Sequence, residues 1–136
     1  MDSPTQESTP VGAWVLFFVF GLLFVAYGVY LVVLPSASPD HWRTYTTDPD
    51  VVAYLADDFQ ATGGLTVAFG ALTALASAHW FRAGDRGAWY AFWIFPLLFG
   101  WGMATSWAVG LWLVLLLAAL AGLVLSYRRF FPSPEP

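Results

Sequence analysis

The side chains of this sequence that could bind an ion or move a proton are few, and most lie at the ends of apolar segments. Two adjacent carboxylates, Asp57 and Asp58, precede an uncharged stretch with hydroxyl groups at helical spacing. At about 100° per residue, Asp58 and the hydroxyls share one arc of a helix. Such a face could offer oxygen ligands to an ion or a small solute. The members of this candidate polar face are Asp57, Asp58, Thr62, Thr66, Thr73 and Ser77.

Small residues beside the hydroxyls give the same helix a second interpretation. Gly63, Gly70 and Ala74 occupy the neighbouring arc, and the first apolar segment carries Gly21 and Gly28 seven residues apart. Small residues let membrane helices approach closely, and Thr or Ser can bond its own backbone four residues back. Because no charge lies in the middle of an apolar segment, we favour packing, with an ion or solute path as the alternative.

Other chemistry lacks its usual residues. The chain has no cysteine and no lysine, and neither His-Glu-x-x-His nor Gly-x-Ser-x-Gly occurs. The two histidines, His41 and His79, fall on opposite membrane faces of the topology below, so they cannot be the two axial ligands of one haem. We therefore predict no catalytic residue, no cofactor and no metal site. Asp57 and Asp58 have two interpretations: they form a cation or proton site, or they are solvated side chains at the rim of this face.

Long uncharged segments predict a membrane protein with a single domain over residues 1–136. Hydrophobic residues make up 59% of the chain and charged residues 10%. A helix of about 20 apolar residues crosses a hydrocarbon core of about 30 Å. We expect the all-α fold class, with a four-transmembrane-helix bundle. The expected spans are residues 11–34, 61–81, 88–101 and 107–127, with a polar loop and a helix start at Asp48-Pro49-Asp50 within residues 35–60.

One bend and two turns are expected along these spans. The pair Gly63-Gly64 predicts a bend in the second helix. A tight connection follows at residues 81–87, where Gly84 suits a left-handed stop and Asp85 suits a cap. Residues 87–127 form an uncharged run that would be about 60 Å long as one helix, so it must turn once, near residues 100–106.

The arginines give the orientation. With four spans, Arg82, Arg86, Arg128 and Arg129 share one side and Arg43 stands alone on the other. The positive-inside rule then places both termini in the cytoplasm, with the protein in the cell membrane. Acids outnumber arginines nine to five. This balance without lysine predicts a halophilic archaeon, with a high-GC bacterium as the alternative, and excludes nucleic acid as a partner.

Two stretches resemble small four-span membrane proteins of archaea and actinobacteria with a DoxX-like bundle plan. One is FRAGDRGAWYAFW at residues 81–93, and the other is the glycine-rich segment at residues 61–70. The resemblance implies a four-helix bundle and transfers no functional residue. We expect a non-enzymatic structural or accessory subunit that forms a homo-oligomer or joins a membrane complex. The alternatives are a small-solute or ion transporter using the Thr62–Ser77 face and, less supported, an intramembrane enzyme or quinone-binding component.

Overall fold

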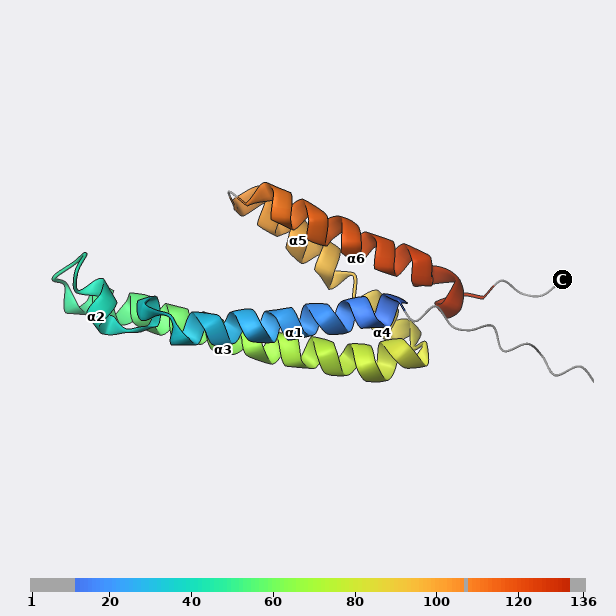
Figure 1. Cartoon of the computed structure of the whole chain (residues 1–136), viewed down its shortest axis with the longest axis horizontal. Coiled ribbons are helices and arrows are strands. Elements are labelled where there is room, and N and C mark those ends of the chain that lie inside the picture. The colour runs from blue at the N-terminus through green and yellow to red at the C-terminus, as the bar shows by residue number, and fades with distance from the viewer. Residues whose placement is uncertain (1–11, 107, 133–136) are drawn as a thin grey trace, which may run out of the picture. The chain divides into compact units, whose positions relative to one another are not determined.

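The computed structural model describes residues 12–106 and 108–132, and all regular structure in these ranges is helical (Figure 1). Two compact units make up the chain. We call Phe18–Ser77 the glycine unit, and the described parts of Met1–Phe17 and Ala78–Pro136 the aromatic unit. The helices are α1 Gly12–Val33, η1 Pro35–Ala37, α2 Pro39–Trp42, α3 Pro49–Ala76, η2 Ser77–Phe81, α4 Arg86–Ala91, α5 Ile94–Thr105 and α6 Val109–Phe130.

Three of the described helices are long and apolar enough to cross a membrane. They are Gly12–Val33, Pro49–Phe81 and Val109–Phe130, each of 22 residues or more. Length and composition thus identify an all-helical membrane protein. The second helix, α3 with η2, has 33 residues, or about 50 Å at 1.5 Å per residue. A hydrocarbon core of about 30 Å leaves several turns of it outside.

Capping and an irregular turn mark the two ends of α3. Asp48 accepts hydrogen bonds from the backbone N–H groups of Asp50 and Val51, and Pro49 takes the first helical position, where its missing N–H costs nothing. The helix keeps α-helical structure through Gly63 and Gly64, where the sequence predicted a bend. The departure comes later, at Ser77–Phe81, which form a π-helical turn.

The segment predicted as one span at residues 88–101 is two helices. α4 ends at Ala91, and α5 begins at Ile94 after a turn at Phe92 and Trp93. Pro96 explains the break, since its ring would collide with the carbonyl of Phe92 in a continuous helix and it has no N–H to donate. Starting anew at Ile94 puts Pro96 in the first turn of α5, where proline is tolerated.

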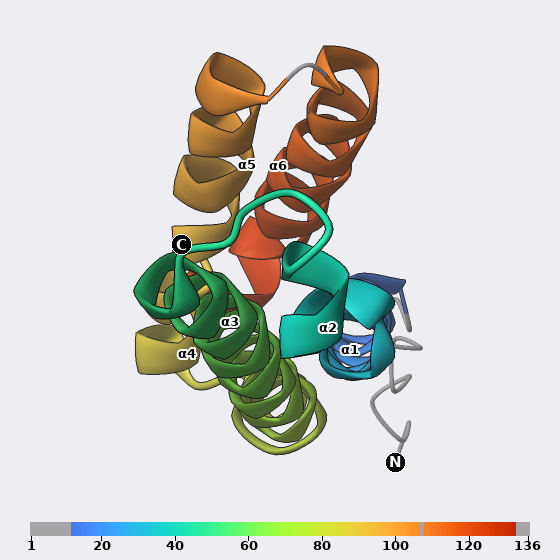
Figure 2. The same ribbon diagram turned by 90° about the vertical axis from the view of Figure 1, so that its left-hand side faces the viewer.

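α5 and α6 lie side by side in both ribbon views (Figures 1 and 2). α5 runs on to Thr105, so Gly100 and Gly102 lie within the helix, and the connection to α6 follows at the end of the predicted range. Gly102 has a packing reason, because a Cβ there would lie 2.5 Å from the Trp112 ring of α6. Trp112 Nε1 is buried without an acceptor among the described residues, so this fit leaves one donor unpaired.

Candidate functional site

The glycines of α1 and α3 meet in the glycine unit. A Cβ built on Gly21 would lie 2.6 Å from the backbone N of Ala74 and 2.7 Å from the carbonyl oxygen of Gly70. Seen from α3, a Cβ on Gly70 would lie 2.6 Å from the carbonyl oxygen of Gly21 and from the backbone N of Val25. These distances are shorter than real Cβ contacts. The two backbones therefore touch where any larger residue would hold them apart.

A second contact of the same kind lies farther along the pair. A Cβ on Gly28 would lie 2.6 Å from the carbonyl oxygen of Gly63 and from the backbone N of Val67. One on Gly63 would lie 2.6 Å from Val32 Cγ2 and 2.9 Å from the Gly28 carbonyl oxygen. Each helix spaces its two glycines seven residues apart, about two turns, so antiparallel helices bring both pairs into register at once. α1 and α3 accordingly run alongside each other (Figures 1 and 2).

The predicted hydroxyl face divides along α3. Thr62 is exposed and Thr66 half-buried, and the Thr66 hydroxyl donates to the Thr62 carbonyl oxygen at 2.7 Å. Thr73 is 6% exposed and Ser77 fully buried, on the side that carries Gly70 and Ala74. The Thr66 hydroxyl thus donates within its own helix, as Thr and Ser hydroxyls in membrane helices commonly do.

The two carboxylates above this face are exposed. Asp57 and Asp58 lie on α3, and among the described residues no group of three or more His, Cys, Asp or Glu could hold a metal ion. Nearby, Gln60 Nε2 donates to the Ala37 carbonyl oxygen at 3.0 Å. The amide that the sequence places beside the acids therefore ties α3 to η1.

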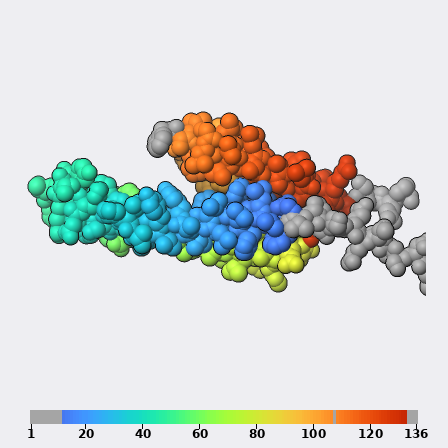
Figure 3. All heavy atoms as spheres, viewed as in Figure 1, coloured from blue at the N-terminus to red at the C-terminus, as the bar shows by residue number. Residues whose placement is uncertain are grey.

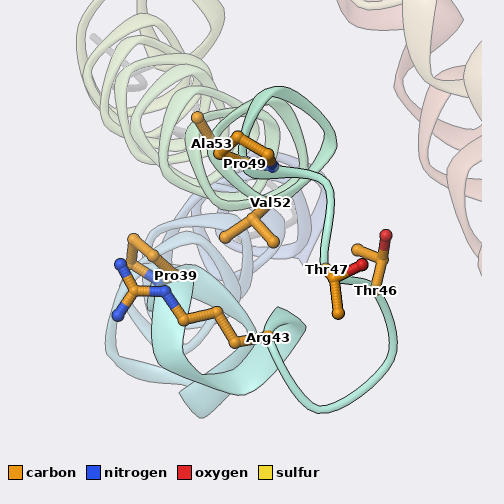
Figure 4. Close-up of a pocket in the computed structure, with 7 residues that line it drawn as sticks. All are labelled: Pro39, Arg43, Thr46, Thr47, Pro49, Val52 and Ala53. Atoms are coloured by element: carbon orange, nitrogen blue, oxygen red, sulfur yellow. The ribbon is translucent and has the colours of Figure 1, made fainter.

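A small cap closes the loop end of the glycine unit, where η1, α2 and the following loop gather (Figure 3). Trp42 Nε1 donates to the Ser36 carbonyl oxygen at 2.6 Å, and its ring lies 5.7 Å from the Phe59 ring. Beside it is an open pocket of about 440 Å³ with Val52 at its centre (Figure 4). Its lining residues are Pro39, Arg43, Thr46, Thr47, Pro49, Val52 and Ala53. The pocket's cation, Arg43, is already paired with Asp40 at 2.6 Å.

The aromatic unit is built from rings that sequence analysis did not single out. Phe17 lies edge-on to Phe81 and Phe92 at centroid distances of 5.2 and 4.7 Å, and Phe81 contacts Phe130 at 4.8 Å. α5 continues the cluster with Phe95 and Phe99. The spacing of residues 92, 95 and 99 is that of one helix face, which is the signal available in the sequence. In a membrane span it is weak, because lipid-facing residues are equally apolar.

One buried hydrogen bond fixes α4 to α6. Trp89 Nε1 donates to the Leu123 carbonyl oxygen at 3.1 Å, and the Ser126 hydroxyl donates to the same oxygen at 3.0 Å. Trp89 also lies against Tyr127 and Phe131. This bond satisfies the buried indole N–H and gives the Trp89 ring a single orientation.

The comparisons with known proteins add no assignment. No protein-family model, curated protein or solved structure matches this chain. The resemblance to DoxX-like bundles therefore stays a prediction, and function has to be inferred from the geometry alone.

Proposed function

We propose that this chain is a four-pass membrane subunit with a structural role, acting as a homo-oligomer or as the accessory subunit of a membrane complex. The observation that carries the proposal is the double glycine contact between α1 and α3. A hydroxyl beside that contact bonds its own helix, since Thr66 donates to the Thr62 carbonyl oxygen. A chain specialised in this way acts by presenting a rigid apolar surface.

The fourth pass would be α4 and α5 taken together. Residues 86–105 would rise about 30 Å at 1.5 Å per residue, which matches a hydrocarbon core. α5 lies beside α6, whose length and composition suit a span. Four passes put both termini on one side, where the positive-inside rule places them in the cytoplasm.

Cysteine labelling tests the number of passes, since the natural chain contains no cysteine. Single cysteines at Ser38, Ala83, Thr105 and Pro132 are offered to a membrane-impermeant maleimide on intact cells. We expect Ser38 and Thr105 to label from outside, and Ala83 and Pro132 only after permeabilisation. Labelling of Thr105 on the same side as Ala83 would mean that α4 and α5 do not cross, leaving three passes.

An assembly should form through surfaces that the fold leaves open. Gly64, Ala68 and Ala71 are exposed on α3, and a Cβ on Gly64 would meet nothing within 4 Å. Native mass spectrometry of the full chain, extracted gently from its own membrane, should give masses above the 15.0 kDa of one chain. Gly64→Leu should lower the assembly yield without unfolding the chain. A solitary 15.0 kDa species in the natural protein would contradict the proposal.

The alternative, a transporter for an ion or small solute, is favoured by one observation: α3 and the turn that follows it bury two hydroxyl residues, Thr73 and Ser77. Flux through proteoliposomes separates the two roles. A transporter would lose flux in Asp58→Asn and Thr73→Val while keeping its thermal stability. The structural proposal expects no flux above that of empty liposomes in any of these proteins.

A further inference from the structure

Four arginines gather at one end of the aromatic unit. Arg82 follows the η2 segment, Arg86 begins α4, and Arg128 and Arg129 lie in the last turn of α6. Hydrogen bonds hold these segments together: Arg86 Nε donates to the Phe130 carbonyl oxygen at 2.9 Å, and an Arg129 amino group donates to the Arg82 carbonyl oxygen. We call these four residues the arginine cluster.

Helix capping explains part of the cluster. The Arg86 and Arg129 bonds satisfy carbonyls at helix ends, where arginine is favourable to the dipole. Gly84, with φ +82°, makes the turn between η2 and α4, and Arg129 Nε lies 4.0 Å from the place where a Cβ on it would be. Capping does not account for Arg82, whose guanidinium lies over the Trp14 ring at 5.1 Å, or for exposed Arg128.

The cluster has no carboxylate partner among the described residues. The one salt bridge in the described part of the chain joins Arg43 to Asp40, in the glycine unit. Asp85 lies in the same turn as the cluster, but its carboxylate accepts from the backbone N–H of Ala88 at 2.9 Å and caps α4. Four like charges at the end of apolar helices repel one another unless anions lie between them.

We propose that the arginine cluster binds the phosphate headgroups of anionic lipids in the leaflet that surrounds it. Two observations favour lipid over a soluble anion. The cluster begins where the uncharged stretches of η2 and α6 end, which is headgroup level for a membrane helix. The exposed rings of Tyr90 and Trp93 follow the cluster's first two arginines in the sequence, and that of Tyr127 directly precedes its last two. Such rings prefer the membrane interface.

Native mass spectrometry of the full chain in neutral detergent tests this with titrated phosphatidylglycerol and phosphatidylcholine. We expect phosphatidylglycerol to bind more tightly than phosphatidylcholine. Arg128→Gln should weaken the affinity for phosphatidylglycerol about fivefold, and Arg82→Gln should weaken it by a similar factor. Neither substitution removes a helix cap. Arg43→Gln, which removes the arginine of the glycine unit, is the matched control and should leave lipid binding unchanged.

Three results would overturn the proposal. Equal affinity for the two lipids would show that the charge is not recognised, and an equal loss in Arg43→Gln would show that the cluster is not the site. Displacement of phosphatidylglycerol by inorganic phosphate, or by an aspartate-rich peptide, at constant ionic strength would assign the cluster to a soluble anion or to an acidic protein. Melting temperatures equal to that of the natural protein show that each variant is folded.

Discussion

The glycine unit and the aromatic unit solve one physical problem with opposite side chains. In lipid, apolar helices gain little from avoiding water, so they associate through van der Waals contact and hydrogen bonds. The glycine unit obtains contact by removing side chains, so that backbone meets backbone at Gly21 and Gly70. The aromatic unit fills the space with rings around Phe17. A larger side chain at the glycines should therefore destabilise the first interface, whereas a smaller side chain in place of a ring should destabilise the second.

Removing a ring from the aromatic unit should have the largest effect. Phe95 is 1% exposed and touches Phe92 and Phe99, so Phe95→Ala leaves a cavity and should lower the free energy of unfolding by about 3–5 kcal/mol. Leu97→Ala is the control, since Leu97 lies on the same helix and is 69% exposed. Thermal unfolding in one detergent measures both. Equal losses in the two variants would mean that the rings are not the core of this unit.

Adding one methyl group to the glycine unit should have a smaller effect whose sign depends on position. Gly70→Ala forces apart two backbones and should cost about 1–3 kcal/mol. Gly64→Ala meets open space on the same helix and should gain up to about 1 kcal/mol from helix propensity. Unfolding of the two variants in sodium dodecyl sulfate, followed by circular dichroism, gives the difference. A stabilising Gly70→Ala would show that α1 and α3 are not in backbone contact.

The hydrogen bond of the aromatic unit should contribute less than its rings. Trp89→Phe keeps a ring but loses the N–H donated to Leu123, and should cost about 1 kcal/mol. Trp101→Phe is the matched control, because Trp101 is largely exposed. If chemical denaturation finds the two substitutions equivalent, the Trp89 bond contributes nothing measurable.

Thr66→Val should have the smallest effect. The Thr66 hydroxyl bonds a carbonyl of its own helix, so its loss should change the free energy of unfolding by less than about 0.5 kcal/mol. The same denaturation assay measures it. A loss above about 1 kcal/mol would assign the hydroxyl an interhelical role and reopen the polar face as a functional path.

Sequence patterns indicate the helical class and the apolar segments because charge-free runs of bilayer length are typical of membrane-spanning helices. The cap and proline at Asp48 and Pro49 mark the start of α3 for an equally local reason. Gly102 shows where such reasoning fails. It suggested a turn, but its role is to accept the Trp112 ring from the neighbouring helix. Glycine in a membrane helix signals either a turn or a close contact, and only the partner helix decides which.

The residues of the candidate site could be predicted from the sequence, but their contacts with one another could not. Spacing placed Gly63, Gly70 and Ala74 on one face of a helix, and the equal spacing of Gly21 and Gly28 fits them, but only the structure shows that these glycines contact one another. The four arginines of the cluster were noted in the sequence because their number predicts an orientation, whereas their hydrogen bonds join residues more than forty positions apart. Contacts over such sequence separations arise from tertiary packing and leave no local pattern.

Because Ser77–Phe81 form a π-helical turn, the effect of deleting one residue depends on where in the helix the deletion lies. A π turn holds one residue more than the α turn it replaces. Deleting one residue between Gly63 and Gly70 would rotate one glycine by about 100° away from its partner. Deleting one within Ser77–Phe81 would convert that turn to regular α-helix and leave both glycine contacts in phase. The turn is therefore a place where this helix can change its length by one residue without changing the α1–α3 register.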